Sequence, residues 1–253
     1  MRTIRLYAPT TLSTGTECLL PEEASNHALR VLRLRAGERL RLFDGAGHEF
    51  QAELLGARGK LAAVRVGDAI VVAPPSPLHI TLMQGVARGE RMDLVMQKAT
   101  ELGVARLVPV LCARSVVQLD QRQRERRHEH WHSIVVNACE QSGRSELPQL
   151  APAQTLANAL DVLKREVDTA GQPALRLTLD PEGQASFVEQ ITARHALVLL
   201  VGPEGGLDEM ELEMARQAGF AGARLGPRIL RTETAPLAAL AIAQAVAGDL
   251  GGW

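Results

Sequence analysis

The last two thirds of the chain alternate short, continuous apolar runs with longer segments of helical periodicity. Helical patterns occur at residues 91–103, 120–143, 207–219 and 236–248. The apolar runs that indicate strands are LHITLMQGV (78–86), VARLVPVLC (104–112), ALRLTL (174–179), HALVLLV (195–201) and GARL (222–225). Apolar strands that alternate with helices are typical of a parallel sheet covered on both faces. The pattern therefore predicts an α/β domain.

The first part of the chain alternates apolar and polar positions instead. Residues 38–57 alternate around Asp44, Gly45 and Gly47, which is typical of a β-hairpin, and residues 60–72 alternate again. A short helix is indicated just before them, in EEASNHALRVLRL. These patterns predict a small β-rich, barrel-like domain.

A cluster of prolines marks the boundary that we expect between the two patterns. Pro74, Pro75 and Pro77 cannot donate backbone hydrogen bonds, and proline disfavours helix in the residue before it. We predict a stiff linker here, with one domain over residues 1–72 and a second over residues 73–253.

Three of the predicted strands end in turns rich in glycine and proline. In GPEGG, residues 202–206, the glycines can adopt positive φ and let a ligand lie against bare backbone. Asp208 and Glu211 then have the spacing of a capping box at a helix start. Ligand sites in open α/β sheets lie beyond the carboxyl ends of strands, where this turn falls. A tight strand-to-helix turn that needs glycine for shape alone explains it equally well.

The other two turns are LDPEG, at 179–183, and LGPRILRTETA, at 225–235. Arg228 and Arg231 flank two apolar residues just before a predicted helix, and such a mixture is typical of a pocket rim. A helix cap with surface arginines is the alternative. The chain has neither GxxxxGK[ST] nor GxGxxG, which argues against a P-loop and against a Rossmann dinucleotide site.

Composition adds little about partners. The formal net charge is −1, which gives no global sign of a nucleic-acid ligand, but only three of the 28 basic residues are lysines. Arginine favours bidentate contact with phosphates and carboxylates, although a compositional bias of the genome explains the excess as well.

Three separated cysteines without a CxxC motif argue against a disulfide framework and indicate a reducing compartment. The start of the chain has no apolar segment typical of a signal peptide, and no apolar run is long enough to span a bilayer. We therefore expect a cytoplasmic protein without membrane contact. The segment RHEHWH, residues 127–132, lacks HExxH and an obvious third ligand, so no metal site is expected.

The paired motifs GPEGG and LGPRILRTETA resemble the RsmE family of 16S ribosomal RNA uridine-N3 methyltransferases, a branch of the SPOUT methyltransferases. The resemblance extends to MQKATELGVARLVPVLCARS (96–115), ACEQSGRSELPQL (138–150) and NHALRVLRLRAGERLRLFDGAG (26–47). Small departures are Arg91, where lysine is common, and Asp208, where serine or threonine is usual.

The resemblance implies a SPOUT-type, trefoil-knotted parallel-sheet domain with a small N-terminal PUA-like β-barrel domain for RNA binding. It also implies a homodimer that methylates N3 of a specific uridine in 16S rRNA of the 30S subunit, with S-adenosylmethionine as the methyl donor. Residues expected to contact the donor are Leu179, Leu200, Gly202, Pro203, Glu204, Gly205, Leu225, Gly226, Ile229 and Leu230.

The residues expected near the target base are Arg231, to stabilise the uridinate anion, Glu233, to accept its proton, and Arg144. Glu233 can instead be a favourable charge at a helix N-terminus, and Arg144 can form an i,i+4 pair with Glu140. The residues expected to bind RNA are Arg30, Arg33, Arg35 and Arg114, and a solvated surface is the alternative for each.

Two other functions remain open at this point. One is a non-catalytic RNA-binding factor for ribosome assembly, which would have no need of a donor pocket. The other is a SPOUT methyltransferase that acts on another RNA base or on a ribose.

Overall fold

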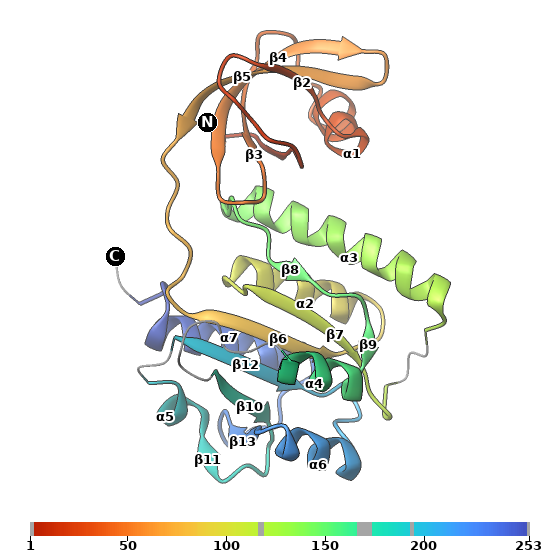
Figure 1. Cartoon of the computed structure of the whole chain (residues 1–253), viewed down its shortest axis with the longest axis vertical. Coiled ribbons are helices and arrows are strands. Elements are labelled where there is room, and N and C mark those ends of the chain that lie inside the picture. The colour runs from red at the N-terminus through yellow and green to blue at the C-terminus, as the bar shows by residue number, and fades with distance from the viewer. Residues whose placement is uncertain (1–2, 116–118, 166–173, 193–194, 252–253) are drawn as a thin grey trace. The chain divides into compact units, whose positions relative to one another are not determined.

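The computed structural model describes residues 3–115, 119–165, 174–192 and 195–251 (Figure 1). The chain divides into two compact units. Unit 1 comprises Met1–Pro75 together with Val136–Leu147, and unit 2 comprises Ser76–Val135 and Pro148–Trp253. The sequence did not predict that the segment Val136–Leu147 would join the first unit. The boundaries 1–72 and 73–253 stay a prediction.

Unit 1 is built on a five-stranded sheet in the order β1-β3-β4-β5-β2. Only β1 and β3 pair in parallel; the other pairs are antiparallel. The strands are β1 (Arg5–Tyr7), β2 (Glu17–Leu19), β3 (Arg39–Phe43), β4 (Glu49–Arg58) and β5 (Leu61–Ile70). Strands β3 and β4 form the hairpin expected at Asp44, whose carboxylate accepts backbone N–H bonds from Ala46 and His48 inside the turn.

A short helical segment covers the apolar face of this sheet. It comprises α1 (Glu22–Asn26) and the π-helical turn η1 (His27–Val31), where the sequence indicated one regular helix. Ala24 and Ala28 are buried with Leu6, Leu42 and other residues of the sheet.

Hydrogen bonds with a buried ion pair hold the segment Val136–Leu147 in unit 1. Arg5 and Glu49 approach to 2.8 Å, with side chains only 8% and 3% exposed. Arg5 also donates to the carbonyl oxygens of Cys139 and Arg144, while Ser145 donates to Glu49. Arg5 thus gives a charged donor to two carbonyl groups, one in the last turn of the helix that contains Cys139 and one just beyond the helix end.

Unit 2 contains an eight-stranded sheet in which all strand pairs are parallel. Its order is β11-β13-β10-β12-β6-β7-β8, and β9 also pairs with β7. The strands are β6 (His79–Gly85), β7 (Arg106–Leu111), β8 (Gln149–Leu150), β9 (Gln154–Thr155), β10 (Leu175–Leu179), β11 (Ala185–Ser186), β12 (Ala196–Val201) and β13 (Ala221–Arg224). Four adjacent strands of this sheet are β13, β10, β12 and β6. Because they run parallel, their carboxyl ends lie at the same edge of the sheet.

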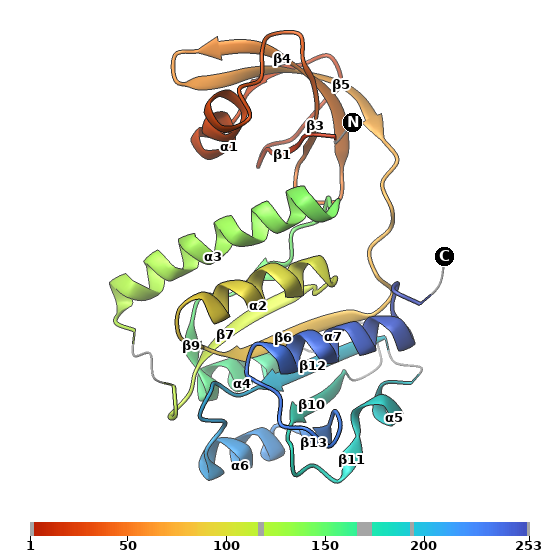
Figure 2. The ribbon, with the colours of Figure 1, turned by 180° about the vertical axis from the view of Figure 1, so that it is seen from behind.

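Helices pack on both faces of this sheet, as Figures 1 and 2 show from opposite sides. Helices α4 (Leu156–Arg165) and α6 (Glu209–Gln217) lie on one face, and α2 (Glu90–Glu101) and α7 (Thr234–Ala247) lie on the other. Helix α5 (Phe187–Ile191) packs against α7. Helix α3 (Gln121–Ser142) begins in unit 2 and ends in unit 1. The prediction of an α/β domain is confirmed. The sequence analysis did not predict α4, α5 or the two-residue strands.

In the described part of the chain, no helix combines the length and apolarity needed to cross a membrane.

Candidate functional site

Three strand-end turns line one cavity of about 520 Å³ in unit 2. The end of β10 and the turn after it contribute Leu179 to Pro181, and the turn after β12 contributes Gly202 to Glu204. The segment after β13 contributes Leu225, Gly226 and the residues that follow them. The sheet order explains the meeting, because β10 pairs with both β12 and β13. The expectation that these turns converge is therefore confirmed.

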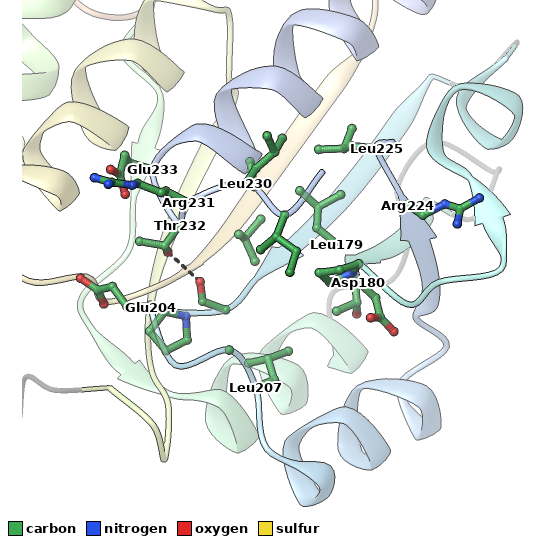
Figure 3. A pocket seen from close by; sticks show the side chains of 18 of the residues that line it. Leu179, Asp180, Glu204, Leu207, Arg224, Leu225, Leu230, Arg231, Thr232 and Glu233 are labelled. Atoms are coloured by element: carbon green, nitrogen blue, oxygen red, sulfur yellow. Dashed lines mark hydrogen bonds between the residues drawn. The ribbon is translucent and has the colours of Figure 1, made fainter. Parts of the chain in front are cut away.

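The middle of the cavity is apolar, and its two sides are polar. In Figure 3, Leu179, Leu225 and Leu230 lie between two groups of charged side chains. One group is Arg231, Glu233 and Glu204, and the other is Asp180 and Arg224. An apolar cavity of this size with a few convergent polar groups is typical of a small-molecule or cofactor site.

A buried hydroxyl connects two of the turns to the end of β6. Thr232 donates a 2.8 Å hydrogen bond to the carbonyl oxygen of Gly202 and accepts one of 3.2 Å from the amide of Gln84. The Gln84 amide also donates to the carbonyl oxygen of Gly85, and its side chain is 1% exposed. Buried polar groups need partners, so this chain of bonds fixes the positions of the turns.

An ion-pair cluster lies on the charged side of the cavity. The Nη1 atom of Arg91, from α2, lies 2.9 Å from Oε1 of Glu204, and its Nε atom lies 3.9 Å from Oε1 of Glu233. The backbone N–H of Arg88 donates to the same Glu204 oxygen at 3.0 Å. Partial burial opposes ionisation of Glu204, but these donors outweigh it and hold the pKa of Glu204 below its usual value.

The glycines at the strand ends make room for the protein's own backbone. A Cβ on Gly202 would lie 3.0 Å from backbone atoms of Gly206 and Leu207, and one on Gly85 would lie 2.5 Å from the nitrogen of Pro203. Gly206 has φ of +70°, which favours glycine. Close packing of the backbone therefore explains the glycines of GPEGG, which was one of the two explanations that the sequence left open. Gly202 also lines the cavity.

The loop after Gly206 leads into α6 through the capping box that the sequence indicated. Asp208 accepts from the Glu211 N–H at 2.7 Å, and Glu211 accepts from the Asp208 N–H at 3.0 Å. The second Glu211 oxygen accepts from the N–H of Ala113, which follows β7. The buried Glu211 thus joins α6 to the neighbouring strand end. Burial, assisted by this carboxylate, raises the pKa of Cys112 to about 12.

Most of the residues predicted to contact a donor line the cavity. These are Leu179, Gly202, Pro203, Glu204, Leu225, Gly226, Ile229 and Leu230. Two do not: Leu200 is fully buried in the sheet core, and Gly205 packs against Arg114. A direct contact of these two with a ligand stays a prediction.

The residues predicted near a target base divide between the units. Arg231 and Glu233 line the cavity, and Glu233 is the N-cap residue of α7 without a capping hydrogen bond from its side chain. Arg144 belongs to unit 1, so its role stays a prediction. Glu140 accepts from the backbone N–H of Tyr7.

The residues predicted to bind RNA also divide between the units. Arg30, Arg33 and Arg35 are exposed on unit 1 around η1, and Arg33 has φ of +54°, unusual outside glycine. Arg114 is exposed on unit 2, but its Nη1 atom donates to the carbonyl oxygens of Gly205 and Leu207. The roles of all four stay predictions.

Sequence reasoning missed Arg91, Asp180 and Thr232 as residues of the site, although all three line the cavity. Thr232 and Asp180 stood inside the motifs already singled out, so their place beside strand ends was a usable signal. Arg91 gave no signal in the sequence, apart from standing at a position where the RsmE family commonly has lysine.

Of the histidines of RHEHWH, His130 has a carboxylate partner, since its Nε2 atom lies 2.9 Å from Asp93 of α2. Among the residues that the structure describes, no group of three or more His, Cys, Asp or Glu side chains is placed to hold a metal ion.

Comparisons with known proteins agree with this geometry. Residues 74–244 match the family model of an RNA methyltransferase domain, and residues 20–72 match that of an RNA methyltransferase PUA domain. The chain is 31% identical to Ribosomal RNA small subunit methyltransferase E of Bacillus subtilis, over 92% of this chain and 89% of that protein. The chain belongs to the RsmE family of RNA methyltransferases. Its fold is therefore a parallel-sheet methyltransferase domain with an N-terminal PUA-like domain.

Two solved structures resemble the whole chain. Ribosomal RNA small subunit methyltransferase E from Neisseria gonorrhoeae, bound to S-adenosyl methionine, has a TM-score of 0.88 and 39% identity, covering 98% of this chain and 99% of that one. A Legionella pneumophila protein in complex with the bound cofactor SAM has a TM-score of 0.89 and 37% identity, covering 99% and 100%. The trefoil knot implied by membership of the SPOUT group stays a prediction.

Proposed function

We propose that this RsmE-family chain transfers the methyl group of S-adenosylmethionine to N3 of a uridine in 16S rRNA of the small ribosomal subunit. The observation that supports it most directly is the cavity formed by three strand-end turns in a chain of this family. Related proteins that match nearly the whole chain are solved with this cofactor bound.

The cavity has the properties that the cofactor needs. Its volume of about 520 Å³ lies within the range of about 300–1,000 Å³ typical of ligand pockets. Leu179, Leu225 and Leu230 offer an apolar wall for an adenine ring, and the turns offer backbone groups for its polar edge. When bound, the cofactor supplies a methyl group on a positively charged sulfur.

The uracil ring must lose its N3 proton, because the neutral nitrogen has no lone pair available for attack. Glu233 is our candidate for the proton acceptor, and Arg231 is our candidate to stabilise the negative charge left on the ring. Both line the same side of the cavity. Proton transfer to Glu233 and methyl transfer to N3 together yield a methylated uridine, a protonated carboxyl group and the demethylated cofactor.

Our candidates for contacts with rRNA phosphates are four arginines: Arg30, Arg33, Arg35 and Arg114. Arg144 stays a further candidate near the target base. We also propose a homodimer and the 30S subunit as the substrate particle. A ribosomal substrate is consistent with the cytoplasmic location expected from the sequence.

One experiment tests the reaction. Small subunits from a strain without this gene are incubated with the protein and labelled S-adenosylmethionine, and the labelled nucleotide is mapped. The label should lie on N3 of one uridine. Label on a ribose oxygen would favour the alternative SPOUT activity, and an absence of label with intact RNA binding would favour a non-catalytic assembly factor.

A variant tests the proton acceptor. Glu233→Gln should lower the single-turnover rate by about 100-fold or more, because general base catalysis typically contributes 10²–10⁴-fold. The affinity for the cofactor, measured by calorimetry, should stay unchanged. An unchanged rate would contradict the assignment of Glu233.

A further inference from the structure

The side chain of Arg91 joins two walls of the proposed active site. Its guanidinium group contacts Glu204, on the loop after β12, and approaches Glu233, at the start of α7. The two carboxylates are 29 residues apart in sequence, and Arg91 comes from a third element, α2. The ion-pair cluster therefore spans three segments that end at the cavity.

The position of Arg91 within α2 does not explain its charge. The residue lies in the first turn of the helix, which begins at Glu90. A cation there opposes the helix dipole, with a typical cost of about 0.3–1 kcal/mol. The charge therefore needs a reason outside α2, and the two carboxylates provide one.

Glu233 has one carboxylate oxygen that is left without a hydrogen bond in the described part of the chain. Its side chain is 14% exposed, and its Oε2 atom is buried without a hydrogen-bond partner among the described residues. A buried carboxylate without a counter-charge is strongly unfavourable. Arg91 supplies a cation to this carboxylate, with its Nε atom 3.9 Å from Oε1 of Glu233.

We propose that Arg91 is a positioning residue for methyl transfer, which anchors Glu204 and supplies the counter-charge that holds the Glu233 carboxylate in place. This inference rests on the proposed role of Glu233 as the proton acceptor. It differs from an RNA-phosphate contact, the role that a basic residue at this position would otherwise suggest. The guanidinium is directed at protein carboxylates instead.

The test separates the rate from RNA binding. At saturating cofactor, Arg91→Gln should lower kcat by about 10- to 100-fold, because small misplacements of catalytic groups have effects of this size. KM for the small subunit, and the dependence of RNA binding on salt, should stay as in the wild type. Arg91→Lys should recover part of kcat, since lysine keeps the charge but not the planar, forked geometry.

A matched control comes from Arg88, three residues earlier. Its backbone N–H contacts Glu204, while none of the described contacts involves its side chain. Arg88→Gln removes the same charge and keeps that backbone contact, so kcat should not change. A loss equal to that of Arg91→Gln would mean that general charge, rather than the ion pairs, matters.

A double variant decides whether Arg91 acts through Glu233. In the Glu233→Gln background, Arg91→Gln should lower kcat by less than about twofold further, because interacting residues are non-additive. Fully additive losses would overturn the proposal. So would an unchanged kcat with a raised KM and a salt slope reduced by about one, the signature of a phosphate contact. Failure of the proposed function is seen separately, as wild-type protein that does not methylate uridine N3.

Discussion

Replacement of Thr232 by valine should loosen the turns that form the cavity. Valine has nearly the shape of threonine but lacks the hydroxyl group that joins Gly202 to Gln84. The Gly202 carbonyl would lose this donor, and the Gln84 amide would keep only the Gly85 carbonyl. Thr232 is 8% exposed and Gln84 is 1% exposed, so water replaces these bonds poorly.

The expected loss follows from this burial. A buried donor or acceptor left without a partner costs about 1–3 kcal/mol. For a domain of this size, each kcal/mol lowers the melting temperature by about 2–4 °C. Thermal unfolding of Thr232→Val against the wild type measures the loss, and calorimetric titration with S-adenosylmethionine measures the effect on the cavity. We expect weaker cofactor binding, because Gly202 lines the cavity.

A nearby threonine provides the control. Thr234 is exposed at the first position of α7, and its hydroxyl forms no hydrogen bond with any residue that the structure describes. Thr234→Val should change stability by less than about 0.5 kcal/mol, as surface substitutions usually do. The double variant Gln84→Leu/Thr232→Val should cost less than the sum of its parts, since both remove one shared bond. Equal melting temperatures and equal cofactor affinities for Thr232→Val and Thr234→Val would refute the reasoning.

Two further predictions concern buried carboxylates. Glu211→Ala should destabilise unit 2 by about 1–3 kcal/mol in thermal unfolding, because the N–H groups of Asp208 and Ala113 lose their acceptors; the exposed Glu213→Ala is the control and should have little effect. Burial opposes ionisation of Glu49, but hydrogen bonds from Arg5 and Ser145 outweigh it and hold its pKa below the usual value. The stability that this carboxylate contributes is therefore present above the unfolded-state pKa of about 4.3 and is lost as pH falls through the lower folded-state value. In urea unfolding, the difference between wild type and Glu49→Gln should shrink from pH 7 to pH 3.

The sequence was informative where local pattern and sheet chemistry agree. Apolar runs that end in glycine and proline indicated β10, β12 and β13, and parallel pairing then placed their ends together. The capping box of α6 was also a local signal, since both of its residues lie within four positions. Such features depend on neighbours in the chain, so a single sequence contains them.

The polar contacts of the site depend on residues far apart in the chain. Arg91 and Glu204 are 113 residues apart, and Gln84 and Thr232 are 148 apart. Neither pair has a periodic signal, because the pairing depends on which strands become neighbours. The same limit applies to Val136–Leu147, most of which lies within the helical pattern of residues 120–143 but which packs in unit 1 through Arg5.

The glycines show how close packing and ligand access can require the same residue type. Strand β6 pairs with β12, so its last residue, Gly85, lies against the turn that follows β12. The 2.5 Å that would separate a Gly85 Cβ from Pro203 is too short for any side chain, and the backbone of the turn fills that space. The turn can therefore fold tightly over the sheet edge and still present Gly202 to the cavity. The same glycines serve tight packing of the turn and access of a ligand to its backbone. The glycines alone therefore could not have distinguished a binding loop from a structural turn, and the charged residues that flank the turn make that distinction.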